Sequence, residues 1–301
     1  MFHELQIFEN PEAILLVASI IFFFSIIAGK AGFRFGLPAL LLFLGVGMLF
    51  GSDGLGIQFS NPSAAQFIGM LALSIILFSG GMDTKMSEIK PIATEGVVLA
   101  TVGVLLTTLI TGGFIYYVFL WSTGYETLTV AESMLMAAVM SSTDSASVFS
   151  ILRSKGVYLK QRLRPTLELE SGSNDPMAYM LTLLIIAYIQ VGGMNLQEAV
   201  LQLLVQLSVG AIAGFLLGKL AVLMINKINM DNESLYPILL LTTAFFTFSA
   251  TTLCKGNGYL AVYIAGLVVG NAKIVHKKSM GTFFDGFAWL WQIVMFLSLI
   301  H

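Results

Sequence analysis

Residues 168–176 read Glu-Leu-Glu-Ser-Gly-Ser-Asn-Asp-Pro and open an apolar run that continues to residue 191. The preceding apolar run is interrupted at residues 141–145 by Ser-Ser-Thr-Asp-Ser. Ionisable side chains inside a membrane-spanning segment are costly, so they face the protein interior or a water-filled cavity and mark paths for ions or protons. The two stretches therefore predict a membrane protein that moves ions.

Composition indicates an all-α polytopic membrane protein. Hydrophobic residues make up 57% of the chain and charged residues 11%, against about 25% charged residues in an ordinary soluble domain. Apolar runs close to the ~20 residues needed to cross a bilayer recur from end to end. The single cysteine, Cys254, excludes an intrachain disulfide, and the three histidines lack metal-binding spacing. No cofactor is predicted.

Ten segments are predicted to span the bilayer, at about residues 13–29, 38–51, 64–81, 93–121, 131–152, 165–191, 197–225, 235–254, 258–272 and 283–300. The N-terminus lacks the basic region of a signal peptide, so the first span is expected to be retained. If the spans alternate, fourteen of the fifteen Lys and Arg residues lie on one side of the membrane, and only Lys255 lies on the other. The positive-inside rule makes that side cytoplasmic and places the N-terminus outside. The same rule accounts for the basic loop 153–164, so no nucleic-acid partner is predicted.

Two of the apolar segments share a glycine pattern. The segments 38–51 and 258–270 both end in Gly-x-x-x-Gly, at residues 47–51 and 266–270. Small residues at this spacing allow close helix packing, whereas internal duplication is common in secondary transporters. Both interpretations stay open. A duplication would leave its second unit incomplete at His301, so a C-terminal truncation is expected.

The two polar stretches are predicted to meet near the middle of the membrane. Asp144 lies nine residues inside the segment that ends at Arg153, at a depth of roughly 13–14 Å. Asp175 lies ten residues after Pro165, a favourable first helical position, at roughly 15 Å. Both depths are near the centre of a ~30 Å hydrocarbon core, so adjacent antiparallel spans would bring the carboxylates together.

The hydroxylated stretch 141–145 predicts a broken helix. Ser, Thr and Asp compete with the backbone for hydrogen bonds and favour caps over helix interiors. A break would put Asp144 near the N-terminus of a half-helix, whose dipole favours an anion, and carbonyls freed around Thr143 would coordinate a cation. The alternative is a continuous helix whose hydroxyl groups bond back by one turn.

The stretch 168–176 predicts a cation site on one helix face. Ser171 and Asp175 are four residues apart and therefore share a face. With Thr143 they would form a hard-oxygen site for a monovalent cation, where proton and cation compete for one carboxylate. Pro176 removes one backbone hydrogen bond. The alternative for Asp175 is a neutral, protonated structural acid; Glu170 is expected to hold Asn174 or to pair with a cation elsewhere.

The chain resembles the monovalent cation:proton antiporters of the sodium/proton and potassium/proton exchanger type, with bacterial potassium/proton antiporters as the most similar subgroup. The motifs that carry the resemblance run over the whole chain, at residues 37–38, 77–82, 142–152, 167–177, 260–263 and 285–290. The resemblance implies thirteen helices in two inverted six-helix repeats, a homodimer in the bacterial cytoplasmic membrane, and a core domain that moves against a dimerisation domain. It therefore implies dimerisation helices at residues 1–91, half of the core at 92–192, a linking helix at 193–230 and an incomplete second repeat at 231–301.

The resemblance also implies roles for individual residues. Asp175 would carry the ion and the proton, beside Asn174; Ser171 and the unwound Thr143-Asp144 segment would complete the ion site. Glu170 would pair with an arginine on an eleventh helix, beyond His301. Ser142 and Ser79 would support the site. Many relatives carry an acidic residue in place of Ser79, and this departure leaves the identity of the cation open.

Four functional interpretations follow from the sequence. A coupled antiporter would need a titrating Asp175, whereas a passive channel or ion-gated sensor of the same fold would conduct with asparagine there. An intramembrane hydrolase would use Asp144 and Asp175 as a dyad sharing a proton, but the sequence offers no substrate groove, so no enzyme is predicted. The fourth interpretation is a fragment without transport activity. The expected partners are the lipid bilayer and a second copy of the chain, with no small-molecule substrate beyond ions.

Overall fold

The computed structural model describes residues 11–35, 39–51, 54–56, 61–123, 128–144, 148, 159–160, 162–191 and 196–298. All regular secondary structure within these residues is helical. The chain divides into two compact units, one of residues 1–76 with 283–301 and one of residues 77–282. The predicted site residues all belong to the second unit.

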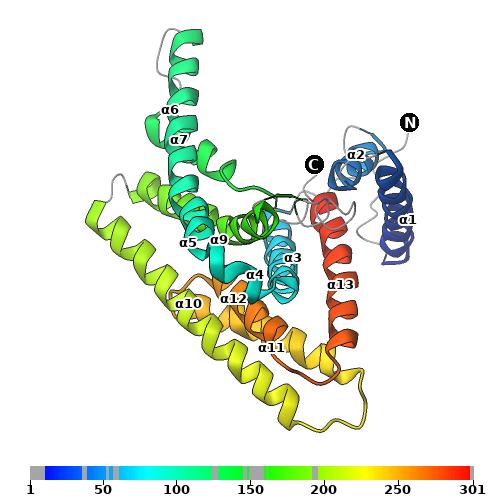
Figure 1. Cartoon of the computed structure of the whole chain (residues 1–301). Helices are drawn as coiled ribbons and strands as arrows, with labels where there is room; N and C mark the ends of the chain where they lie inside the picture. Colours follow the sequence, from blue (N-terminus) through cyan, green and yellow to red (C-terminus); the bar gives the residue numbers. More distant parts are fainter. Residues whose placement is uncertain are drawn as a thin grey trace. The chain divides into compact units, whose positions relative to one another are not determined.

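The α-helices follow one another as α1 (Pro11–Phe35), α2 (Ala39–Phe50), α3 (Pro62–Asp83), α4 (Met86–Ile89), α5 (Ala93–Val98), α6 (Val104–Thr123), α7 (Val130–Val139), α9 (Leu163–Val191), α10 (Leu196–Lys227), α11 (Leu235–Leu253), α12 (Gly258–Asn271) and α13 (Lys277–Ser298) (Figure 1). A 3-10 turn, η2 (Lys90–Ile92), joins α4 to α5, and a π-helical turn, η3 (Leu99–Gly103), joins α5 to α6. Each of the ten predicted spans contains a helix in the described part of the chain, although the span at 131–152 is helical only to Val139 before its break, and this confirms the predicted all-helical fold.

Four of the described helical stretches are long and apolar enough to cross a membrane: Pro62–Asp83, Met86–Ser122, Gln197–Lys227 and Leu235–Leu253. Shorter apolar helices lie at Leu15–Lys30, Ala39–Phe50, Val130–Val139 and Gly258–Asn271. Long apolar side chains stand exposed along α6 and α10, such as Ile110 at 71% and Ile212 at 61%. Such exposure is consistent with contact between these helices and lipid, because lipid tails are as apolar as these side chains.

In the first unit, α1 and α2 pack against each other. Phe43 of α2 is buried, and its ring lies opposite Gly29 of α1, where an added Cβ would meet the ring at 3.4 Å. The same ring makes an edge-to-face contact with Trp289 of α13, at 6.2 Å between ring centroids. An aromatic side chain therefore joins three helices of this unit.

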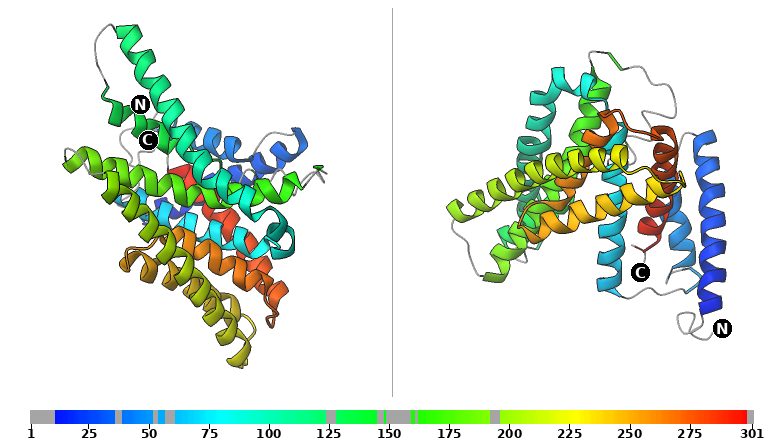
Figure 2. Two further views of the ribbon diagram at one scale, coloured as in Figure 1. Left: turned by 60° about the vertical axis from the view of Figure 1, so that its left-hand side comes forward. Right: turned by 90° about the horizontal axis from the view of Figure 1, so that it is seen from below.

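α12 is the most enclosed helix of the second unit. Nine of its 14 residues are buried, and it packs against α9, α10 and α11 (Figures 1 and 2). Glycines on α10 permit the close approach: a Cβ added at Gly214 would lie 2.8 Å from Ala261 Cα, and one at Gly218 would lie 3.0 Å from Ala265 Cα. Small residues spaced by four let two helix backbones come together in this way.

The glycine pattern of α12 serves a second contact. A Cβ added at Gly266 would lie 3.2 Å from Phe78 Cα, and one at Gly270 would lie 2.6 Å from the carbonyl carbon of Met82. Gly-x-x-x-Gly therefore allows α12 to pack directly on the C-terminal turns of α3. The packing interpretation of this motif is confirmed for α12, while internal duplication stays a prediction.

α7 stops where the sequence predicted a break. A capping box starts the helix: the Thr129 hydroxyl accepts from the Glu132 backbone N–H, while the Glu132 carboxylate accepts from the backbone N–H of Thr129. The helix ends at Val139, and residues 141–144 are not helical. A continuous helix over residues 131–152 is therefore wrong at this point. Residues 145–147 and 149–152 lie outside the described part of the chain.

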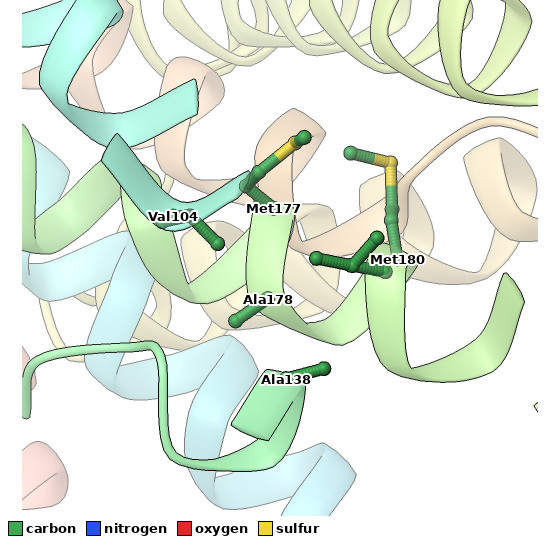
Figure 3. Packing of buried hydrophobic residues seen from close by; sticks show 6 residues of the cluster. Val104, Ala138, Met177, Ala178 and Met180 are labelled. Carbon is green, nitrogen blue, oxygen red and sulfur yellow. The ribbon is translucent and has the colours of Figure 1, made fainter. Parts of the chain in front are cut away.

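α9 runs through Pro176 and is held beyond it by apolar packing. The buried cluster draws on three helices and comprises Val104 of α6, Ala138 of α7, and Met177, Ala178, Met180 and Leu181 of α9 (Figure 3). Ala138 stands one turn before the break in α7, and Met177 follows the polar stretch of α9 directly. The cluster therefore brings the break in α7 alongside the site residues of α9.

Candidate ion-binding site

The candidate site lies where the non-helical residues after α7 cross the polar turns of α9. Ser142 Oγ donates a hydrogen bond to Asp175 Oδ1 and also lies 3.1 Å from Asn174 Oδ1. A hydroxyl group has one proton to donate, and hydrogen bonds to a charged carboxylate are stronger than those to a neutral amide. Ser142, which lies in the break, therefore orients the Asp175 carboxylate of α9.

Thr143 makes a second link between the break and α9. Its Oγ1 accepts a hydrogen bond from Asn174 Nδ2 at 2.7 Å and donates to Ser171 Oγ at 3.1 Å. Ser171 is fully buried, and Thr143 is exposed. The hydroxyls of Thr143 and Ser171 are thus bonded to each other at the edge of the buried region, and Thr143 follows Ser142, the residue that bonds to Asp175.

Asn174 is the central link of this network. Its Nδ2 donates to Thr143 Oγ1 and to Glu170 Oε1, the latter at 2.8 Å, so both amide hydrogens have acceptors. The residue is only 1% exposed. A buried amide with both donors bonded cannot change partners without losing a hydrogen bond, so Asn174 fixes the spacing between Thr143 and Glu170.

The backbone of the break is arranged as at a helix start. The carbonyl of Asp144 accepts from the N–H of Val148 at 3.0 Å, which is the spacing of an α-helical hydrogen bond. Accepting the first helical bond is typical of an N-cap residue. Asp144 is exposed beside Thr143. The carbonyl of Ala138, at the end of α7, accepts from Ser141 Oγ at 2.7 Å.

Two residues of the α12 region contact the same turns of α9. The ring of Tyr263 lies on Gly172, where an added Cβ would be 2.8 Å from Tyr263 Cε2. Asn257 Nδ2 donates to the carbonyl of Pro176 at 3.0 Å. Neither residue was predicted for the site. Both had a sequence signal that did not assign them to the site: Tyr263 belongs to the motif 260–263 that carries the resemblance, and asparagine before the first helical residue, as at Asn257, is typical of an N-cap.

The structure brings together six of the predicted residues, namely Ser142, Thr143, Glu170, Ser171, Asn174 and Asp175. Ser79 is different: it is buried on α3, whose neighbouring Phe78 and Gly81 pack against α12. Glu168, in the same polar stretch of α9, is buried and forms an ion pair with Arg164 at 3.1 Å.

The side chains around Asp175 offer oxygen atoms of one chemical kind. A carboxylate and the hydroxyls of Ser142, Thr143 and Ser171 are hard ligands, which suit alkali and alkaline-earth cations better than soft metals. Within the described ranges, no three His, Cys, Asp or Glu side chains gather as metal ligands. Chemically, such a set of oxygen atoms can coordinate a hard cation, and the carboxylate can also take up a proton.

Replacing Thr143 by valine is expected to lower the free energy of unfolding by about 1–3 kcal/mol, because the buried amide of Asn174 loses an acceptor. Thr143→Ser keeps the hydroxyl and is expected to unfold close to the parent. Thermal unfolding in detergent, followed by circular dichroism, compares the three proteins. Equal unfolding temperatures for the valine and serine variants would show that the link to α9 does not stabilise the fold.

The chain has relatives among ion exchangers. The K(+)/H(+) antiporter NhaP of Alkalimonas amylolytica is 39% identical over 292 residues, which are 97% of this chain and 50% of that protein. The K(+)/H(+) antiporter NhaP2 of Shewanella sp. (strain ANA-3) is 36% identical over 294 residues, which are again 97% of this chain and 50% of that protein. The chain therefore spans about half the length of these curated relatives.

The fold is also that of a solved exchanger. The sodium proton antiporter MjNhaP1 from Methanocaldococcus jannaschii superposes with a TM-score of 0.76 over 95% of this chain and 71% of that one, at 24% sequence identity. The family described as sodium/hydrogen exchanger, transmembrane, matches residues 13–299. Because this match covers nearly the whole sequence, the chain belongs to the sodium/hydrogen exchanger transmembrane family.

Proposed function

We propose that the chain exchanges a monovalent cation, potassium or sodium, for protons across the membrane, with Asp175 as the carboxylate that both ions occupy in turn. The observation that carries the proposal is the hydrogen bond from Ser142 to Asp175 across the break in the helix. It joins the acidic turn of α9 to the non-helical segment, as in transporter sites built from broken helices. Both polar stretches then serve one site.

Competition at a single carboxylate supplies the coupling. When Asp175 loses its proton, its negative charge and the hydroxyls of Ser171 and Thr143 form an oxygen site for a cation. When Asp175 is protonated, the charge that held the cation is gone. Asn174 and Glu170 keep the ligands in place through the bond between them, at 2.8 Å. One proton therefore replaces one cation, and the two are never bound together.

The membrane setting is part of the proposal. We infer an inner-membrane protein with its N-terminus outside and with a second copy of the chain as partner. We assign residues 1–91 to dimerisation, 92–192 to the moving core, 193–230 to a linking helix and 231–301 to a second repeat. Potassium and sodium are proposed because one relative, 39% identical, is named a K(+)/H(+) antiporter, and another, 28% identical, is named a probable Na(+)/H(+) antiporter.

Cation-triggered proton movement in proteoliposomes tests the proposal. The purified chain is reconstituted with a pH-sensitive dye inside, and potassium, sodium and lithium chloride are added separately outside. The expected result is a rise in internal pH with potassium or sodium, absent with choline chloride and in protein-free vesicles. Cation uptake without proton movement would identify a passive channel instead. No flux of either kind from folded protein would contradict transport by this chain.

A further inference from the structure

The site helix α9 has a weak point in its own backbone. Pro176 has no N–H group, so the carbonyl of Gly172 lacks the donor that an α-helix would provide. The missing bond would span residues 172–176. Ser171, Asn174 and Asp175 all lie within or beside this range. The positions of the site side chains therefore depend on restraints from outside α9.

The α12 region supplies restraints at both ends of this weak point. At one end, the buried ring of Tyr263 covers Gly172 so closely that a Cβ there would be 2.8 Å from Cε2. At the other end, Asn257 Nδ2 donates to the Pro176 carbonyl at 3.0 Å. Gly172 and Pro176 are four residues apart and so share one helix face, beside the face that carries Ser171 and Asp175.

Asn257 is itself held in one orientation. Its Oδ1 accepts from the backbone N–H of Leu260 at 2.9 Å, as the N-cap of α12. Its own backbone N–H donates to the carbonyl of Gln206 on α10 at 3.0 Å. Since Oδ1 faces a donor and Nδ2 faces the Pro176 carbonyl, the two bonds assign the amide without ambiguity. Asn257 is only 4% exposed and joins three helices through these bonds.

We propose that Asn257 is a positioning residue for the ion site, which sets the placement of Asp175 by holding the Pro176 carbonyl to the start of α12 and to α10. This inference rests on the proposed function. A residue that only stabilised the fold would change the unfolding temperature at every cation concentration by the same amount. A positioning residue would also change the cation concentration at which the site is half-saturated.

Asn257→Ser separates the two bonds of this side chain. Serine is as good an N-cap as asparagine, so the bond from Leu260 is retained, but its hydroxyl is too short to reach the Pro176 carbonyl as well. Asn257→Asp is the second variant: it keeps the size and the capping oxygen, and in its charged form at alkaline pH it cannot donate. Reading both variants keeps the test valid if one of them fails to fold.

Asn271→Ser is the control. Asn271 lies at the other end of α12 and also ties it to another segment, because its Nδ2 donates to the Thr84 carbonyl at 2.8 Å and its Oδ1 accepts from the Met86 N–H at 2.8 Å. These bonds do not involve α9. The control variant therefore loosens α12 without touching the Pro176 carbonyl.

The measurement is the unfolding temperature of the full chain in detergent as a function of potassium or sodium chloride concentration, at constant ionic strength with choline chloride. Binding to the folded state raises this temperature, so the curve gives the half-saturating cation concentration. We expect Asn257→Ser, and Asn257→Asp at alkaline pH, to raise that concentration about tenfold, as for one lost buried hydrogen bond. Asn271→Ser is expected to lower the unfolding temperature and leave the half-saturating concentration within about twofold.

The outcomes separate this inference from the proposed function. A parent chain that responds to neither cation would overturn the proposed cation site and the inference with it. A responsive parent whose Asn257 variants keep the parental half-saturating concentration would overturn the inference alone. An equal shift in Asn271→Ser would also overturn it, because the effect would then come from α12 as a whole.

Discussion

Asp175→Asn is expected to reduce cation-driven proton movement in proteoliposomes to the level of protein-free vesicles. Asparagine keeps an oxygen that accepts the hydrogen bond from Ser142, so the network around the break is retained. It can neither release a proton nor carry the negative charge that attracts a cation. The variant thus removes the chemistry of the site with little change in its shape, and the loss is expected at every pH.

Two comparisons make this result specific. Asp231→Asn changes an exposed aspartate in the loop between α10 and α11, and its exchange is expected to equal that of the parent. Asp175→Glu keeps the charge and shifts it by one methylene group, so reduced but measurable exchange is expected. Parental exchange by Asp175→Asn would rule out Asp175 as the shared carboxylate, whereas cation uptake by this variant without proton movement would favour a passive channel.

Gly270→Ala is expected to have the largest effect on folding. The added Cβ would lie 2.6 Å from the carbonyl carbon of Met82 and would overlap its oxygen. The obstacle is backbone on a neighbouring helix, which cannot rotate away as a side chain does. Overpacking costs about 1–3 kcal/mol and occasionally more, and we expect about 3 kcal/mol here, because both helices must separate.

Gly113→Ala is the matched control for this prediction. Gly113 lies within α6, and a Cβ added there meets nothing within 4 Å. Alanine is the better helix former, so the control is expected to gain up to about 1 kcal/mol. Thermal unfolding and the yield of monodisperse protein after gel filtration report both changes. If Gly270→Ala unfolded at the parental temperature, the close packing of α12 on α3 would be wrong.

Helix content was predictable because membrane spans obey a local rule. An apolar run near the length of a bilayer must form a helix to satisfy its own backbone, so each predicted span contains a helix in the described part of the chain. The break after α7 was predictable for a related reason. Four hydroxyl groups and a carboxylate in five residues compete with the helical backbone, and α7 ends at Val139.

Pairing within the site was only partly predictable. Spacing along one helix placed Ser171 with Asp175 and Glu170 with Asn174, because residues four apart share a face. The contact of Ser142 with Asp175 required two segments to meet at one depth, which the segment ends at Arg153 and Pro165 indicated. The supporting role of Ser79 stays a prediction from the resemblance; the residue is buried on α3, in a region that packs against α12.

The sequence by itself determined the class of the molecule, its helices and the two polar stretches that form the candidate site, because each follows from the cost of polar groups in lipid. Only the tertiary structure decided which helices touch. Apolar helices offer many equally apolar neighbours, so no local pattern could tell that Asn257 reaches Pro176, 81 positions earlier, or that Gly270 meets Met82. Those choices arise where glycine lets backbones approach and where one side-chain amide finds a carbonyl on another helix.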